Sequence, residues 1–178
     1  MSAWRGLATE VVATRYPSLV AYGVLLTANR PDSEDLVQDA LVKVFSRIRP
    51  LPNAAAADQY VRRAMLTIYL DGVRRESLWR RIRGAVVSDD AVAGPEHLVT
   101  TGTDLRAALA TLSPRERTCV VLRHFDDLTV AQIAAEVGLA EGSVKRYLSD
   151  AMAKLGAELG EPGERADVVV GSRRAGRN

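Results

Sequence analysis

The sequence predicts an all-α protein made of two small helical domains joined by a flexible acidic linker. Apolar residues recur at helical spacing in several segments, and no segment of any length shows the alternation of a β-strand. Between two helix-rich blocks, residues 85–103 contain Asp89, Asp90 and Glu96 but no Lys or Arg, with Gly and Pro scattered without period. The expected parts are a first domain at 5–84, the linker at 85–103, a second domain at 104–159 and a flexible tail at 160–178.

The composition excludes several classes of protein. The formal net charge is only +2, so a nucleic-acid role has to come from local patches. Cys119 is the only cysteine, which excludes an internal disulfide, and together with His97 and His124 it offers too few ligands for a metal. No apolar run reaches the length of a membrane span, and the N-terminal residues lack the apolar segment of a signal peptide. We therefore expect a cytoplasmic protein without cofactor, metal or membrane contact.

Three helices are expected in the first domain. Residues 11–27 carry apolar residues at helical spacing, with a break near Pro17. A second helix opens at Pro31 and has an apolar stripe at i, i+4 and i+8. A loop at 51–58, LPNAAAAD, leads into a long third helix at about 59–83.

Four shorter helical segments are expected in the second domain. The first spans 104–111, and the second starts at 113–116, where SPRE forms a capping box with Pro at the first helical position. Thr129 and Gln132 form another capping box at the start of the third segment. The fourth begins near Glu141.

Residues 128–155, LTVAQIAAEVGLAEGSVKRYLSDAMAKL, have the pattern of a helix-turn-helix. Ala134 is small where two helices cross, Gly138 suits a left-handed turn, and Leu139 plugs that turn. The second helix has an expected buried stripe of Val144, Leu148, Ala151, Met152 and Leu155. Its outward positions are Glu141, Gly142, Ser143, Lys145, Arg146 and Ser149, which suit phosphate or base contacts in a major groove. The alternative is an ordinary helical hairpin with a solvated face.

The third helix of the first domain is the most basic segment of the chain. Its arginines are Arg62, Arg63, Arg74, Arg75, Arg80, Arg81 and Arg83. They alternate with Tyr60, Tyr69 and Trp79, as in a platform for single-stranded DNA, where charges follow the phosphates and rings stack on unpaired bases. The alternative is that the aromatic residues belong to the core and the arginines only keep the helix soluble.

The second helix has the opposite charge at its start. Its acidic and amide residues are Asp32, Glu34, Asp35, Gln38 and Asp39. They surround Leu36 and Val42, which we expect to be exposed. An acidic face beside a basic one indicates two partners, DNA and a protein with basic residues.

Three segments together carry a family resemblance: YGVLLTANRPDSEDLVQDALVKVF, DQYVRRAMLTIYLDGVRRES and DLRAALATLSPRERTCVVLRHFDDLTVAQIAAEVGLAEGSVKRYLSDAMAKL. In this order the chain resembles a bacterial RNA polymerase sigma factor of the minimal extracytoplasmic-function group, which has only sigma domains 2 and 4. It looks most similar to the actinobacterial SigE-like subgroup. The resemblance covers most of residues 10–156 and is far more specific than the helix-turn-helix alone.

The resemblance implies a role for each part of the chain. It places Asp35, Leu36, Gln38 and Asp39 on the clamp helices of the largest polymerase subunit, and the second domain on the flap of the second subunit. It places Asp58, Arg62, Arg63, Thr67, Arg74 and Arg75 on the minus-ten element, with the loop at 51–58 capturing a flipped base. Ser143, Lys145, Arg146 and Ser149 are placed on the minus-thirty-five element. The implied partners are core RNA polymerase, promoter DNA and, as a regulator, an anti-sigma factor.

Two departures from the family pattern and three rival readings accompany this interpretation. The family often has asparagine at the position of Thr67, and basic residues at those of Tyr147 and Asp150, so the base preferences differ.

The main rival is a stand-alone helix-turn-helix transcription regulator, although no strand pattern of a receiver domain precedes residue 104. An enzyme would have to rely on carboxylates such as Asp126 without a positioned histidine. A purely protein-binding helical adaptor would leave the arginines without a ligand.

Overall fold

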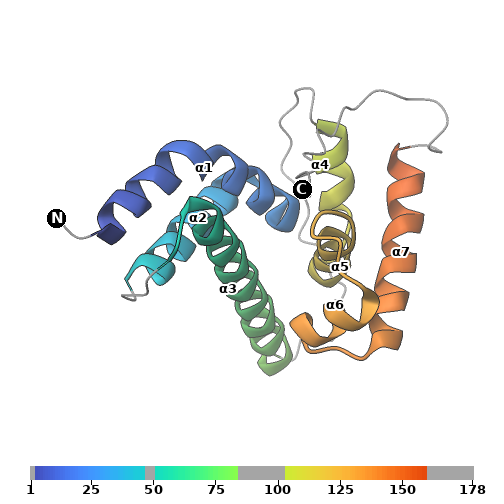
Figure 1. The fold of residues 1–178 in the computed structure, drawn as a ribbon. Helices are drawn as coiled ribbons and strands as arrows, with labels where there is room; N and C mark the ends of the chain where they lie inside the picture. Colours follow the sequence, from blue (N-terminus) through green and yellow to red (C-terminus); the bar gives the residue numbers. More distant parts are fainter. Residues whose placement is uncertain (1–2, 47–50, 84–102, 160–178) are drawn as a thin grey trace.

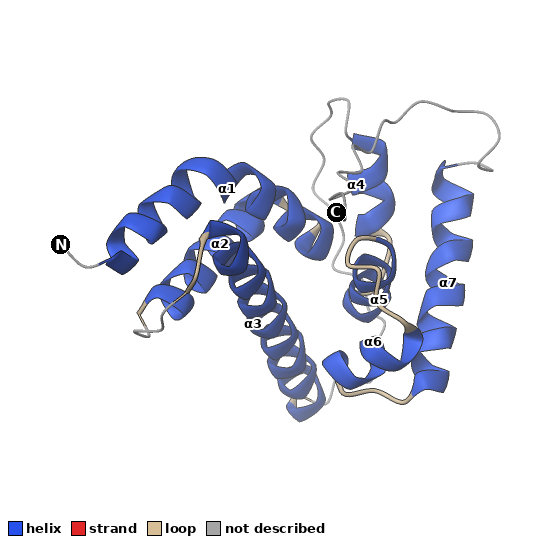
Figure 2. Ribbon diagram, in the orientation of Figure 1, coloured by secondary structure: helices blue, strands red, loops and turns tan. Residues whose placement is uncertain are grey.

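The computed structural model describes residues 3–46, 51–83 and 103–159. Within these ranges it contains helices and turns but no strand, which confirms the predicted all-α class (Figure 2). The helices are α1 (Ala3–Thr27), α2 (Arg30–Phe45), α3 (Ala54–Ile82), α4 (Thr103–Ala110), α5 (Pro114–His124), α6 (Val130–Val137) and α7 (Glu141–Leu159). The predicted linker, apart from Thr103, and the predicted tail lie outside the described residues.

Helices α1, α2 and α3 pack together as a first unit (Figure 1). The break predicted near Pro17 is wrong, because α1 continues through this residue. Proline removes one backbone N–H donor from the helix, but burial on both sides of it compensates for this loss. Val11 before the proline and Leu19 after it are fully buried in the same core, so α1 remains continuous. Helix α2 follows after a short turn, with the Asn29 side chain accepting a hydrogen bond from the backbone N–H of Asp32.

Helix α3 begins five residues earlier than the sequence pattern predicts, at Ala54 rather than near residue 59. The side chain of Asn53 caps it by accepting a 2.9 Å hydrogen bond from the backbone N–H of Ala56. Ala54 and Ala57 are buried, so the alanine run is the first packed turn of a helix. The predicted loop at 51–58 is therefore wrong beyond Asn53, and Asp58 lies on the helix.

Helices α4 to α7 form a second unit whose caps agree with the sequence prediction. Both capping boxes are present, at Ser113 with Glu116 and at Thr129 with Gln132. Gly138 ends α6 in the left-handed conformation, at φ 69° and ψ 41°. The predicted stripe of α7 is wrong at one position, since Met152 is 50% exposed.

Tyr147 takes the buried position that the pattern assigned to Met152. It is 5% exposed and lies one turn before Ala151, which is fully buried. Helix α7 contacts α4, α5 and α6, so its buried surface is wider than the stripe of a simple helical hairpin.

The two units pack against each other. Helix α5 lies against α1, and Figure 1 shows the C-terminal end of α3 beside α6. One cluster of buried apolar side chains contains Leu26 and Met65 from the first unit together with Leu122 and Ile133 from the second. The units therefore share part of their core rather than meeting only at polar surfaces.

No single helix in the described part of the chain is long and apolar enough to cross a membrane. Taken together, residues 5–27 and 30–45 pass the same test of length and composition, but they are bent by 119° where they meet.

The crossing of α1 and α2 gives a stability prediction. A Cβ at Gly23 would collide with the Oγ of Ser33, which is fully buried and donates a 2.7 Å hydrogen bond to the carbonyl of Val20. We expect Gly23→Ala to lower the free energy of unfolding by about 1–3 kcal/mol in urea denaturation. Gly72→Ala on α3, where nothing lies within 4 Å, is the control and should raise it by roughly 0.5–1 kcal/mol. A neutral Gly23→Ala would contradict this close approach of the two helices.

Candidate nucleic-acid interface

Helix α3 presents one continuous exposed face along its length, which we call the α3 face. Apart from the adjacent Arg74 and Arg75, its members are spaced three or four residues apart, so they line one side of the helix. They are Tyr60, Arg63, Thr67, Asp71, Arg74, Arg75, Leu78 and Ile82. Tyr60, Leu78 and Ile82 are among the most exposed large apolar side chains described, at 44%, 57% and 66%. Four of the six residues predicted to bind the minus-ten element lie on this face, which combines basic and apolar groups as single-strand binding requires.

The other two predicted minus-ten residues, Asp58 and Arg62, lie off this face and are engaged with each other. The guanidinium Nε of Arg62 donates a 2.9 Å hydrogen bond to Asp58, and both side chains are mostly buried. The same guanidinium lies 5.0 Å from the ring centroid of Tyr22 and 5.5 Å from that of Phe125. Arg62 is thus held between two aromatic rings, one from each unit.

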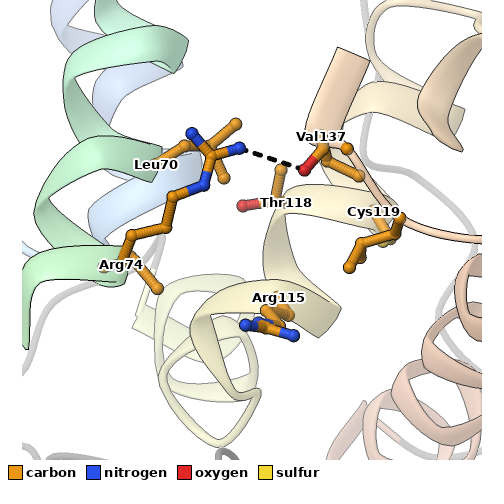
Figure 3. Close-up of a pocket in the computed structure, with 9 residues that line it drawn as sticks. Leu70, Arg74, Arg115, Thr118, Cys119 and Val137 are labelled. Carbon is orange, nitrogen blue, oxygen red and sulfur yellow. Dashed lines mark hydrogen bonds between the residues drawn. The ribbon is translucent and has the colours of Figure 1, made fainter. Parts of the chain in front are cut away.

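Two arginines of the α3 face contact the second unit. Arg63 forms a 3.3 Å ion pair with Glu136, which is on α6. Arg74 donates a 3.2 Å hydrogen bond to the carbonyl of Val137, the last residue of α6 (Figure 3). It donates a second hydrogen bond to Asp71 on its own helix. Thr67 and Arg75 remain exposed on α3.

A small cavity of about 110 Å³ lies beside the contact between Arg74 and Val137. Leu70 and Arg74 line it from α3, and Thr118 and Cys119 line it from α5 (Figure 3). The side chain of Cys119 is 1% exposed, and this burial raises the pKa of its thiol to about 11. The only cysteine of the chain is therefore inert in this arrangement.

The predicted recognition helix, α7, presents a different basic surface. Lys145, Arg146 and Ser149 are exposed, and Ser143 is half-buried. The guanidinium of Arg146 lies 5.2 Å from the ring centroid of Tyr147. Because that ring is part of the core, Tyr147 does not offer a base contact, whereas Asp150 is exposed nearby. The N-terminal half of α7 can therefore enter a groove with its predicted residues outward.

Helix α5 supports α7 through an ion pair. The ammonium group of Lys154 lies 2.8 Å from each carboxylate oxygen of Glu116, which is 3% exposed. Burial alone would raise the pKa of Glu116, but hydrogen bonds from Lys154 and from the backbone N–H of Ser113 hold this pKa below its usual range.

The acidic surface of α2 differs from the sequence prediction at one residue. Asp35, Gln38 and Asp39 are exposed, as expected. Leu36 is only 7% exposed and packs into the core, so the expectation of an exposed Leu36 is wrong. Val42 is 68% exposed and continues the face at i+4 from Gln38 and i+3 from Asp39. Among the residues that the structure describes, no cluster of His, Cys, Asp or Glu could hold a metal ion.

Known proteins share both halves of this arrangement. The family model described as "Sigma-70, region 4" matches residues 103–155. RNA polymerase sigma-E factor of Streptomyces coelicolor is 31% identical over 157 residues, which cover 84% of each chain. The chain belongs to the RNA polymerase sigma factors. ECF sigma factor SigL of Mycobacterium tuberculosis is 28% identical over 151 residues, covering 80% of this chain and 82% of that one.

The fold is also that of a solved sigma factor. Sigma factor RpoE from Bartonella quintana, co-crystallised with the anti-sigma factor NepR, matches with a TM-score of 0.54 at 20% identity. The match covers 85% of this chain and 95% of that one, so it includes helices of both units. This sigma factor is therefore of the extracytoplasmic-function, SigE-like type that its sequence motifs indicated.

The pair of Glu116 and Lys154 gives a pH prediction. Because the folded pKa of Glu116 lies below the ordinary value of 4.5, its contribution to stability is present above that pH and disappears as the pH falls through the folded pKa. We expect Glu116→Gln to lower the free energy of unfolding by about 1–2 kcal/mol at pH 7, and the difference from wild type to shrink as the pH falls below 4.5. Glu158→Gln, an exposed change on α7, the helix that carries Lys154, is the control for general acid effects. A difference that persisted unchanged at pH 3 would contradict the assignment.

Proposed function

We propose that this sigma factor binds core RNA polymerase, directs it to specific promoters and helps to open the DNA at initiation, without chemistry of its own. The observation that carries the proposal is the presence of two separate basic surfaces on one chain of this family. One is the α3 face, with its arginines and exposed apolar groups, and the other is the N-terminal half of α7. The first suits melted DNA and the second suits a major groove.

The division of roles follows these surfaces. The α3 face, with Asp58 and Arg62 beside it, would contact the minus-ten element, and residues 51–53 with the first turn of α3 would border a captured base. Ser143, Lys145, Arg146 and Ser149 would contact the minus-thirty-five element. Polymerase and the two DNA contacts share the binding energy, so neither surface needs high affinity alone.

The acidic face of α2 is the proposed polymerase surface. Asp35, Gln38 and Asp39 would face basic groups on the clamp helices of the largest subunit, and Val42 supplies the apolar contact first assigned to Leu36. The second unit would engage the flap of the second subunit. The role places the protein in the cytoplasm, and an anti-sigma factor, such as the one in the Bartonella complex, is the regulator that this family suggests.

The rival function, a stand-alone regulator, is less well supported. It would use only the helix-turn-helix, whereas the relatives named as sigma factors align over most of the chain. Their match includes the α2 and α3 surfaces, for which a stand-alone regulator has no use.

Polymerase binding is tested at Val42. Val42→Asp places a charge in the centre of the proposed contact at a position that is 68% exposed, so the fold should tolerate it. We expect the affinity for sigma-free core polymerase to fall at least tenfold in size-exclusion co-elution and titration. Val12→Asp, at a 47% exposed site on α1, is the matched control and should bind as the wild type does. Equal binding of both variants would refute the proposed α2 surface.

Promoter opening is tested at the α3 face. Arg74→Ala with Arg75→Ala removes two charges from it, so permanganate reactivity of the minus-ten region in the holoenzyme should fall while core binding is unchanged. The slope of log affinity against log salt for single-stranded minus-ten DNA should decrease by about 1.4, or roughly 0.7 per lost phosphate contact. Arg30→Ala on α2, an exposed arginine outside this face, is the control. Loss of core binding in the double variant would contradict the division of roles.

A further inference from the structure

The cavity of about 110 Å³ beside Arg74 is lined by two arginines from different helices. Arg74 lines it from α3 and Arg115 lines it from α5, and Thr118 lies between them in the view of Figure 3. None of the nine described residues that line the cavity is acidic. The lining therefore carries positive charge without a carboxylate of its own, which favours an anionic occupant.

Arg74 has donors left for such an occupant. A guanidinium carries five N–H donors, and those of Arg74 that are used go to Asp71 and to the carbonyl of Val137, each at 3.2 Å. The pair with Asp71 does not cancel the charge of Arg74, because both side chains are more than half exposed and water screens them. The remaining N–H groups can donate to a carboxylate placed in the cavity.

The charge of Arg115 acts inside the same cavity. Burial raises the pKa of the Cys119 thiol to about 11, and the charge of Arg115 acts in the opposite direction by favouring the thiolate. Cys119 lines the cavity and is 1% exposed. A negative charge that a ligand brings beside this thiol would be stabilised by the same guanidinium.

The rest of the lining is largely apolar and limits the size of a ligand. Leu70 and Val73 line the cavity from α3, Val137 from the end of α6 and Leu139 from the turn that follows it. Pockets for drug-sized ligands measure about 300–1,000 Å³, so this one takes only a small molecule. An apolar cavity of about 150 Å³ holds benzene, which indicates an apolar body of about four or five carbons here.

We propose that this cavity binds a small carboxylate with a short branched apolar body. Its charged end would lie at Arg74 and Arg115, and its body would lie against Leu70, Val73 and Val137. The site follows from the lining of the cavity alone, whereas its effect on DNA binding, given below, rests on the proposed function.

The ligand class is tested with isovalerate, a short branched carboxylate, titrated into the nitrogen-15-labelled full chain at pH 7. We expect saturable shifts of the backbone amide signals of Thr118, Gly138 and Leu139, with a Kd of about 1 mM, as suits a ligand of this size. Isovaleramide has the same shape without the charge and should bind at least tenfold more weakly.

Three results of this titration would overturn the proposal. The absence of saturable shifts at these amides would remove the site. Equal binding of isovaleramide would show that the two arginines do not select an anion. Tighter binding of inorganic phosphate than of isovalerate at the same amides would show that the apolar lining does not contribute.

The two parts of the site are separated by variants. Arg115→Gln should weaken isovalerate at least tenfold and leave the binding of isovaleramide unchanged. Arg123→Gln removes an exposed arginine of the same α5 that does not line the cavity, so it is the matched control and should bind isovalerate as the wild type does. Cys119→Met extends a flexible side chain into the cavity and should abolish the shifts with both compounds.

Wild-type affinity for isovalerate in Arg115→Gln would refute the role of this arginine. Wild-type affinity in Cys119→Met would refute the position of the ligand. If a variant does not fold, the comparison of isovalerate with isovaleramide on the wild type still decides the proposal, because it requires no substitution.

Occupancy of the cavity should also affect the proposed minus-ten surface. Arg74 belongs to the α3 face, so a carboxylate bound to it withdraws one charge from single-stranded DNA. We expect saturating isovalerate to weaken the binding of a labelled single-stranded minus-ten oligonucleotide at least twofold in fluorescence anisotropy. Isovaleramide with sodium chloride at the same concentration is the control and should give a smaller change.

Unchanged DNA affinity at saturating isovalerate would refute this effect on the minus-ten surface. By linkage, saturating oligonucleotide should weaken isovalerate by the same factor. The amide shifts are measured without DNA or polymerase, so failure of the ligand site is distinguished from failure of the proposed function, which the core-binding assay at Val42 tests.

Discussion

The buried guanidinium of Arg117 is the contact on which the arrangement of the two units depends. Within the described residues it donates to the carbonyls of Leu26, Leu109 and Leu112 at 2.8–3.1 Å, and no ion pair with a carboxylate is seen there. Two of these carbonyls belong to the last turns of α1 and α4, where a helix presents partial negative charge. Burial lowers the pKa of Arg117, but the group stays charged and must keep its acceptors. One side chain therefore joins the end of the first unit to two parts of the second.

The position of α5 follows from this contact and determines what happens at the surface. With α5 fixed against α1, the turn that follows it brings Phe125 and Asp126 against Tyr22, and α6 comes to rest beside α3. The surface ion pair of Arg63 and Glu136 is a consequence of this docking, since exposed pairs of this kind are weak. The packing of the two units is thus decided in the buried interface.

The two proposed DNA-binding surfaces of this sigma factor lie on different units, and multivalent binding does not require either surface to have high affinity alone. The α3 face lies within the first unit, and the exposed basic residues of α7 lie within the second. The ion pair between the buried Glu116 and Lys154 stabilises the second unit internally, since both residues belong to that unit.

The all-α class, both capping boxes, the glycine turn of the helix-turn-helix and the family could all be predicted from the sequence, because these features depend on local spacing and backbone geometry. The predictions were wrong for the exposure of residues whose environment is set by segments distant in the chain. Leu36 is buried although its position indicated exposure, Met152 is exposed although its position indicated burial, and α3 begins at its alanine run. The contacts of Arg62 with the rings of Tyr22 and Phe125 could not be predicted from the sequence either, because these two residues are far apart in the chain. Periodicity gives the faces of a helix, but only tertiary packing decides which face meets a neighbour and which meets water.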